Sequence, residues 1–386
     1  MIYLDNAATS PICEAAKNII LDNLDEYYNP NSSYEDAREV KIKVEEAREK
    51  IAALIGAQPD EIYFTSGGSE ANSWVLNHDF TLASNIEHHS IDPDYKFKVD
   101  YRGMVDAEKF KKRVNELQND YFGISPGIAS CMMVNNELGV IEPIKELSKI
   151  AHDNHMLFHT DAVQAFPHMK INVEELGVDM LSCSAHKFGG IKGCGFLYIK
   201  DGIHIHPLIN GGSQERGIRG GTTNVLGVLS MAAALEDTTI HMDENNEKIA
   251  RLSKKIKDNL LNVKGVTING ATDKKQHLDS ILNFRIDGVH GSDVVAMADE
   301  FGIAISSGSA CNEGNAVPSH VLKAIGLSDE EALSSIRVSL GRYNTEEEID
   351  SMIEGFMKNI YNVLCINLGT PPEVVNFETR DKDNNF

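Results

Sequence analysis

The chain has 386 residues, which is too long for one ordinary hydrophobic core and suggests about two or three domains. Its composition, with 42% hydrophobic and 24% charged residues, is that of a globular protein and excludes a disordered or fibrous one. The net charge of −22 repels phosphate backbones and anionic lipid, so direct binding to nucleic acid or to a membrane is not expected.

The cysteines carry no recognisable spacing for a disulfide framework or a zinc site. They are Cys13, Cys131, Cys183, Cys194, Cys311 and Cys365. No apolar run approaches the ~20 residues of a membrane helix, and the first residues do not resemble a signal peptide. Reduced thiols and a cytoplasmic location are therefore expected, and no metal site is predicted.

The first strong periodic element is a helix over 35–55, in which apolar residues recur every three or four positions and Gly56 ends the run. Ser33 followed by Asp36 suggests a capping box at its start. Short apolar runs at 62–65, 129–134, 156–160, 180–184 and 195–199 then alternate with helical stretches. This alternation predicts an α/β fold with a mostly parallel central sheet flanked by helices.

The second half of the chain predicts a smaller α/β unit. A helix near 246–260 carries Ile249, Leu252, Ile256 and Leu260 on one face, and a strand is expected at 281–286. We expect a large domain over 12–245 and a small domain formed by 1–11 and 246–368. The residues 369–386 look like a loose tail.

Several chemically useful groups follow the predicted strands. The sequence Ser-Gly-Gly-Ser-Glu at 66–70 lies between a strand and a helix, where free backbone N–H groups could hold a phosphate, although Gly-Gly turns are also common. Asp161 ends another strand and could pair with a protonated ring nitrogen or cap a helix. Lys187 follows a third strand, where burying a charged amine costs free energy unless the amine is neutralised or has a chemical role, such as forming a Schiff base.

Two further residues stand out in the second unit. Cys311 lies in a stretch of small residues with glycine on both sides, which suggests an exposed, reactive thiol rather than a core cysteine. Arg337, in the segment SSIRVSLGR, is a candidate clamp for a carboxylate, with a surface ion pair as the alternative.

Taken in their order, these segments resemble the cysteine desulfurases, enzymes of fold-type I that depend on pyridoxal 5'-phosphate (PLP). The resemblance covers about residues 3–345, and the serine- and glycine-rich cysteine segment is similar to the subgroup with the longer catalytic loop. The matching segments are YLDNAATSP (3–11), NPNSS (29–33), FTSGGSEAN (64–72), EHHS (87–90), NNELGV (135–140), HTDAVQ (159–164), SAHKFGG (184–190), GGSQERGIRGGTTN (211–224), SSGSAC (306–311) and SSIRVSLGR (334–342).

The resemblance assigns an expected role to each matching residue. Lys187 holds PLP and later moves protons, Asp161 pairs with the pyridine nitrogen, and His88 stacks on the ring and acts as acid or base. Gln164 and Asn136 contact the phenolic oxygen, and Asn29 and Arg337 bind the substrate carboxylate. The phosphate is held by Gly68, Ser69, Ser184 and His186, with Thr222 reaching in from a second subunit, which implies a homodimer.

The implied reaction converts L-cysteine to L-alanine and leaves a persulfide on Cys311. The sulfur then passes to a protein acceptor, such as an iron–sulfur scaffold or a thio-carrier protein, for iron–sulfur cluster or thio-cofactor biosynthesis. The alternatives are a selenocysteine lyase or another PLP β-lyase, and, from another class, a non-catalytic partner or regulator of a sulfur-transfer complex. The chain departs from the family at Tyr34-Glu35, where a histidine is common nearby, and in a shorter stretch from Trp74 to about Phe110.

Overall fold

A computed structural model describes residues 1–77, 80–120, 127–263, 265–273, 275–307, 309–312 and 315–357. Its larger unit is built on a seven-stranded sheet in the order β2-β8-β7-β6-β5-β3-β4. The strands are β2 (Ile62–Thr65), β3 (Thr81–Ser84), β4 (Tyr95–Phe97), β5 (Ile128–Ser130), β6 (Leu157–Asp161), β7 (Met180–Ser184) and β8 (Gly195–Ile199). Only β8 runs against its neighbours β7 and β2, so the predicted mostly parallel sheet is confirmed.

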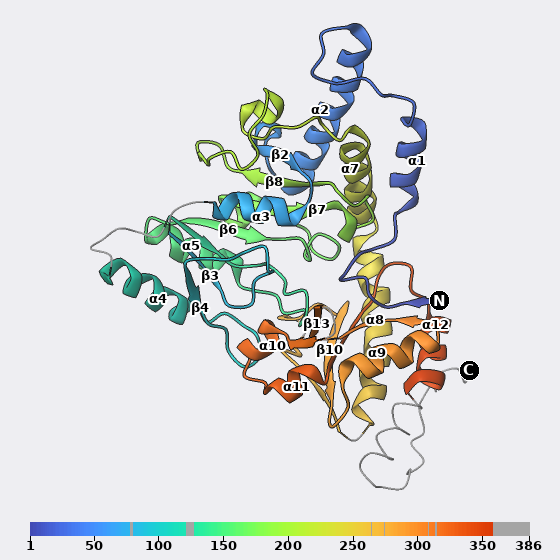
Figure 1. The fold of residues 1–386 in the computed structure, drawn as a ribbon. Coiled ribbons are helices and arrows are strands. Elements are labelled where there is room, and N and C mark those ends of the chain that lie inside the picture. Colours follow the sequence, from blue (N-terminus) through green and yellow to red (C-terminus); the bar gives the residue numbers. More distant parts are fainter. Residues whose placement is uncertain are drawn as a thin grey trace.

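Helices flank this sheet (Figure 1). They are α1 (Glu14–Asp22), α2 (Glu35–Ile55), α3 (Gly68–Leu76), α4 (Ala107–Asp120), α5 (Ile144–Asp153), α6 (Val173–Leu176) and α7 (Val225–Ile240). Helix α3 packs across β6, β7 and β8, α5 packs on β6, and α1 and α2 both pack on α7. Buried apolar side chains from the other six helices and from the sheet form one continuous core, and those of α3 form a second, smaller cluster with Ile128, Met180 and Leu197.

The predicted helix over 35–55 is confirmed as α2, which ends at Gly56 with a left-handed φ of 70°. The predicted capping box is wrong, because Tyr34 occupies the cap position and its side chain makes no capping hydrogen bond. The run predicted as a strand over 129–134 is also shorter than expected. The regular strand β5 ends at Ser130, although the N–H groups of Cys131 and Met133 still donate to His159 O and Asp161 O of β6. The segment then turns at Asn135, whose Oδ1 accepts hydrogen bonds from Glu137 and Leu138 N–H.

The smaller unit is built on an antiparallel sheet in the order β12-β15-β10-β9. These strands are β9 (Val266–Ile268), β10 (Ile281–Ile286), β12 (Ser306–Ser307) and β15 (Ser335–Ser339). The helices of this part are α8 (Met242–Leu261), α9 (Gly291–Glu300), α10 (His320–Ala324), α11 (Asp329–Leu333) and α12 (Glu346–Met352). The expected apolar face of α8, Ile249, Leu252, Ile256 and Leu260, is buried in the core of this unit.

The N-terminal segment joins the smaller unit. Strand β1 (Ile2–Tyr3) pairs in parallel with β11 (Ile303–Ala304), and α8, yellow in Figure 1, runs from the larger unit down into the smaller one. A hairpin of β13 (Ser309–Asn312) and β14 (Asn315–Pro318) precedes α10. The domain boundaries stay a prediction, and the expected tail lies outside the described residues. Among the described residues, no helix is both long and apolar enough to cross a membrane.

Candidate active site

A cavity of about 330 Å³ lies where β6 and β7 end and α3 begins. This is the edge at which parallel strands collect the side chains that bind ligands. Ten of the predicted site residues line it: Gly68, Ser69, His88, Asn136, Asp161, Gln164, Ser184, His186, Lys187 and Arg337. The structure therefore brings together residues that lie up to 269 positions apart in the printed sequence.

Lys187 ends a short 3₁₀ turn that follows β7, and its side chain reaches the N-terminal segment. Its Nζ donates hydrogen bonds to the carbonyl oxygens of Ala7 (2.6 Å) and Ala8 (2.9 Å). Burial, followed by the positive charge of Arg337, lowers the pKa of Lys187 from 10.5 to about 8. An amine with this pKa is partly neutral near physiological pH, as Schiff-base chemistry requires.

Asp161 is a buried carboxylate at the end of β6. Its Oδ1 accepts a hydrogen bond from Val163 N–H at 2.9 Å, and its Oδ2 accepts one from the Asn72 amide at 2.7 Å. Residues 163–168 form turns rather than a helix, so the helix-cap alternative for Asp161 does not hold. A buried carboxylate of this kind, bonded only to neutral donors, suits a cationic ring nitrogen.

Two histidines of the cavity have a lowered pKa. Burial, with the charges of Lys187 and Lys192, lowers the pKa of His186 to about 4, and its Nδ1 lies 3.1 Å from Thr9 Oγ1. Burial is also the main cause that lowers the pKa of His88. The Nδ1 atom of His88 lies 2.7 Å from Ser90 Oγ and 3.1 Å from Ser90 N.

The turn at 66–70 has the geometry of an anion cradle. Helix α3 begins at Gly68, as predicted, and its first N–H groups have no partner within the helix. A Cβ atom on Gly68 would lie 2.7 Å from Val163 Cγ2, so only glycine allows the start of α3 to approach the end of β6 this closely. The Ser66 N–H donates to Glu70 Oε2 at 2.8 Å and closes the turn.

Arg337 lies on β15 and is fixed by three acceptors. Its Nη2 lies 2.8 Å from Asp5 Oδ1 and 3.3 Å from Ser306 Oγ, and its Nη1 donates to Asn136 O at 3.0 Å. Its Nε is buried and has no hydrogen-bond partner among the described residues. Arg337 therefore lines the cavity with a largely buried guanidinium, which the surface-pair alternative does not fit.

The residues present fit PLP. The cavity has a lysine of lowered pKa, a buried carboxylate, and glycine and hydroxyl groups at a helix start that suits a phosphate. PLP is linked covalently to a lysine, pairs its ring nitrogen with a carboxylate, and binds its phosphate at a site of this kind.

Three of the predicted residues are not in this cavity. Asn29 is exposed, and its Oδ1 accepts a hydrogen bond from Asn31 N–H at 3.0 Å. Thr222 lines a separate cavity of about 110 Å³ with Ser66 and Arg219, and its expected role concerns a second copy of the chain. The backbone of Cys311 lies in β13, where it pairs with Ala316, but its side chain lies outside the described residues.

Sequence reasoning assigned no role to Asp5 and Asn72, which contact the predicted residues Arg337 and Asp161. Asn72 lies one helical turn after Ser69, and this spacing places both residues on one face of α3. The spacing could therefore have predicted that Asn72 lies at the site. Asp5 reaches Arg337 only through the pairing of the N-terminus with the smaller unit, which no local pattern reveals.

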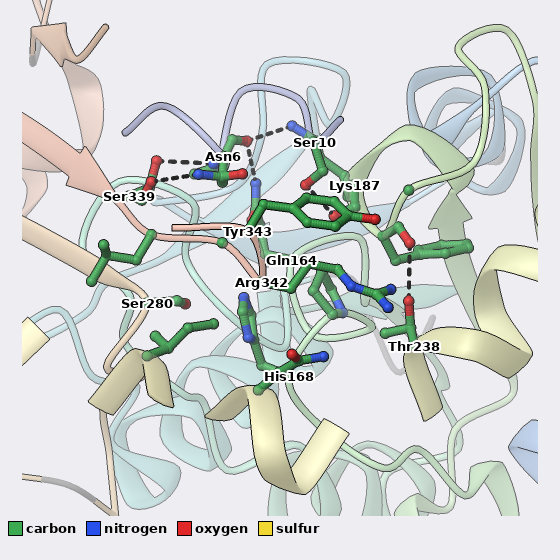
Figure 2. Close-up of a pocket in the computed structure, with 18 of the residues that line it drawn as sticks. Asn6, Ser10, Gln164, His168, Lys187, Thr238, Ser280, Ser339, Arg342 and Tyr343 are labelled. Carbon is green, nitrogen blue, oxygen red and sulfur yellow. Dashed lines mark hydrogen bonds between the residues drawn. The ribbon is translucent and has the colours of Figure 1, made fainter. Parts of the chain in front are cut away.

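A second cavity adjoins the first between the two units (Figure 2). Ala7, Gln164 and Lys187 line both, and the second is otherwise surrounded by groups such as His168, Ser280 and Arg342. Its volume of about 40 Å³ has room for a few water molecules only. Of these two cavities, only the first has room for a cofactor.

The sheet, the smaller unit and this lysine–aspartate site define a fold-type I PLP-dependent enzyme. Residues 2–352 match the aminotransferase class-V family. The chain is 40% identical to cysteine desulfurase IscS of Dictyoglomus turgidum (92% of this chain, 93% of the relative) and 36% identical to that of Methanosarcina thermophila (96% and 95%).

Solved structures agree with these relatives. A NifS-like protein from Rickettsia africae superposes with a TM-score of 0.85 at 32% identity, covering 94% of this chain and 99% of that one. A structure described as SspA in complex with cysteine has a TM-score of 0.76 at 29% identity, covering 89% and 100%. The chain thus belongs to the aminotransferase class-V family, in which it is a PLP-dependent cysteine desulfurase.

Proposed function

We propose that this chain removes sulfur from L-cysteine, releases L-alanine and carries the sulfur as a persulfide on Cys311. The observation that supports this most directly is the cavity that places Lys187, Asp161, His88 and Arg337 around one space. A relative crystallised with cysteine is consistent with the substrate.

The residue roles are part of the proposal. Lys187 holds PLP and afterwards moves a proton through Nζ, and Asp161 keeps the pyridine nitrogen protonated. Gln164 and Asn136 contact the phenolic oxygen, and Gly68, Ser69, Ser184 and His186 hold the phosphate. When bound, PLP withdraws electrons from the substrate carbon and so weakens the bond between Cβ and sulfur.

The remaining steps belong to the protein's own residues. Arg337 binds the substrate carboxylate, and Asn29 is proposed as a second carboxylate ligand. His88 stacks on the ring and lies against the substrate thiol. The Cys311 thiolate then attacks the substrate sulfur, so that a sulfur–sulfur bond forms as the carbon–sulfur bond breaks, and the carbon keeps the electron pair and is protonated to give alanine.

We also propose a homodimer in which Thr222 of one copy completes the phosphate site of the other. A protein acceptor then takes the persulfide sulfur, in the cytoplasm, for iron–sulfur cluster or thio-cofactor assembly. The names of the relatives support this assignment of pathway. The net charge of −22 suggests an acceptor with a basic docking surface.

The test measures alanine and sulfide together after PLP-loaded protein is mixed with L-cysteine and a thiol reductant. We expect equal amounts from the wild type and neither from Cys311→Ser. Lys187→Ala should form neither product, and treatment with borohydride should no longer fix PLP covalently to the protein. Cys194→Ala is the matched control, because Cys194 is buried and burial raises its pKa to about 12, which makes it a poor nucleophile. Full activity of Cys311→Ser would overturn the proposal.

A further inference from the structure

We propose that Asn72 and Ser90 act as positioning residues that fix the tautomer of His88 and tie it to Asp161. This inference rests on the proposed roles of His88 and Asp161. It concerns a chain of four side chains, Asp161, Asn72, Ser90 and His88, that come from three separate segments of the larger unit.

Asn72 is the centre of this chain. It lies on α3, is only 1% exposed, and lines the cavity. Its Nδ2 donates to Asp161 Oδ2 at 2.7 Å and to Ser90 Oγ at 3.0 Å, so both amide hydrogens are used. Since a carboxylate can only accept, the orientation of the Asn72 amide is determined by Asp161.

Ser90 links the Asn72 amide to the ring of His88 through hydrogen bonds. Its hydroxyl oxygen accepts from Asn72, which leaves the hydroxyl proton to be donated to His88 Nδ1 at 2.7 Å. The backbone N–H of Ser90 points to the same Nδ1 at 3.1 Å. A ring nitrogen that faces two donors must be the unprotonated one, so the proton of neutral His88 lies on Nε2.

The charges around His88 agree with a neutral ring. Burial lowers its pKa most strongly, the charge of Asp161 raises it, and Lys187 and His89 lower it further. Protonation of Nδ1 would also set an N–H group against the N–H of Ser90. Neutral His88 therefore has Nε2–H as a hydrogen-bond donor, and Asn72 couples the position of this ring to the carboxylate proposed for the cofactor nitrogen.

The experiment reads the tautomer of His88 without the cofactor. Protein labelled with ¹⁵N-histidine and freed of PLP is examined by long-range ¹H–¹⁵N NMR, and the His88 signals are assigned from a His88→Gln variant. We expect the wild type to show one tautomer with the proton on Nε2. In Ser90→Ala, which keeps the backbone donor but loses the hydroxyl, the population of the other tautomer should rise at least tenfold.

Three further variants separate positioning from folding. Ser90→Thr keeps the hydroxyl and should show the wild-type signals. Asn72→Ala should show the same tautomer mixture as Ser90→Ala. It should also weaken PLP binding about tenfold or more, because Asp161 loses a hydrogen bond to its charged group. Ser73→Ala is the matched control, because Ser73 is the neighbour on α3 and its hydroxyl bonds only to the backbone oxygen of Ser90, at 3.3 Å.

A wild-type proton on Nδ1, or the same tautomer mixture in wild type, Ser90→Ala and Asn72→Ala, would overturn the inference. Because this measurement uses neither substrate nor cofactor, its result is independent of the desulfurase assay. An enzyme that fails that assay while His88 keeps its proton on Nε2 would contradict the proposed function and leave the positioning intact.

Discussion

The guanidinium of Arg337 and the carboxylate of Asp5 form an ion pair, with 2.8 Å between Nη2 and Oδ1. Asp5 follows strand β1, and Arg337 lies on β15, so the pair fastens the N-terminal segment to the smaller sheet. The two side chains are only 20% and 12% exposed. Asp5 therefore orients the guanidinium of Arg337 beside the cavity.

The first prediction concerns substrate binding. Replacing Arg337 with Gln removes a charged donor, and such hydrogen bonds contribute about 1.5–3 kcal/mol, which corresponds to roughly 10- to 100-fold in affinity. We therefore expect Arg337→Gln to raise KM for L-cysteine at least tenfold, with a smaller effect on kcat. Steady-state kinetics of alanine formation give both constants.

Arg342→Gln is the control for this measurement. Arg342 also pairs with a carboxylate, that of Asp237 at 2.6 Å, but it does not line the larger cavity. An equal rise of KM in both variants would show that the loss of any nearby arginine disturbs the site and that Arg337 is not a substrate ligand.

The second prediction concerns the pH at which the protein takes up its cofactor. Only the neutral amine of Lys187 can attack an aldehyde, and its pKa is lowered to about 8, first by burial and then by Arg337. The rate of PLP incorporation should therefore rise with pH and level off above about pH 8. Stopped-flow absorbance of cofactor-free protein mixed with PLP measures this rate.

The same Arg337→Gln variant tests whether the charge of Arg337 lowers the pKa of Lys187. Without that positive charge the protonated amine is less disfavoured, so the midpoint of the profile should move to higher pH, whereas Arg342→Gln should leave it in place. A wild-type midpoint near the ordinary 10.5 would contradict a buried, partly neutral Lys187.

These residues show which parts of the site a sequence can reveal. Asp161 and Lys187 each follow a strand, and the carboxyl ends of parallel strands share one edge of a sheet, so periodicity alone brought them together. The resemblance then extended the set to residues such as Asn136 and Arg337. Both kinds of evidence depend on segments that keep a recognisable pattern.

Other features depend on long-range contacts that leave no local pattern. Asp5 contacts Arg337 across 332 positions, and Asn72 contacts Asp161 across 89. The regular part of the strand expected over 129–134 ends at Ser130, although Cys131 and Met133 still donate hydrogen bonds to β6. The capping box expected at Ser33 fails because the helix begins one residue later, after Tyr34.

The third prediction concerns stability and pH. Glu142 is 4% exposed, its Oε2 accepts from Val105 N–H at 2.8 Å, and its Oε1 has no partner among the described residues. Burial, with a contribution from nearby Glu87, raises its pKa from 4.5 to about 8. Between these two pH values the folded protein holds a proton that the unfolded chain has lost, so the free energy of unfolding falls as pH rises through this window.

Glu142→Gln keeps the acceptor for Val105 and carries no titrating proton. We expect it to flatten the decline between pH 4.5 and 8 and to raise Tm at pH 8 by a few degrees, because each pKa unit of difference is about 1.4 kcal/mol. Thermal unfolding followed by circular dichroism across this range is the measurement. Exposed Glu146→Gln is the matched control, and identical pH profiles for the two variants would contradict a buried, protonated Glu142.

The fourth prediction concerns the turn at 66–70. Glu70, which closes this turn through Ser66, forms a two-pronged ion pair with Arg219, with distances of 2.8 and 2.9 Å and side chains only 8% and 17% exposed. Burial raises the pKa of Glu70, but the hydrogen bonds from Arg219 and Ser66 outweigh it and lower the pKa below 4.5. The pair therefore stabilises the fold above about pH 4.5, and this contribution is lost as pH falls further.

Removing one member of such a pair leaves a buried charge without a partner, which costs about 3–5 kcal/mol. We expect Arg219→Met to lower the free energy of unfolding by about this amount at pH 7, and the double variant Glu70→Gln/Arg219→Met to recover part of it, since no unpaired charge remains. Chemical denaturation of the cofactor-free protein measures both. The exposed pair of Lys17 and Glu14 serves as the comparison, because solvent screens it and Lys17→Met should change little. Equal losses in the single and double variants would mean that packing of the Arg219 side chain, rather than its charge, holds the turn in place.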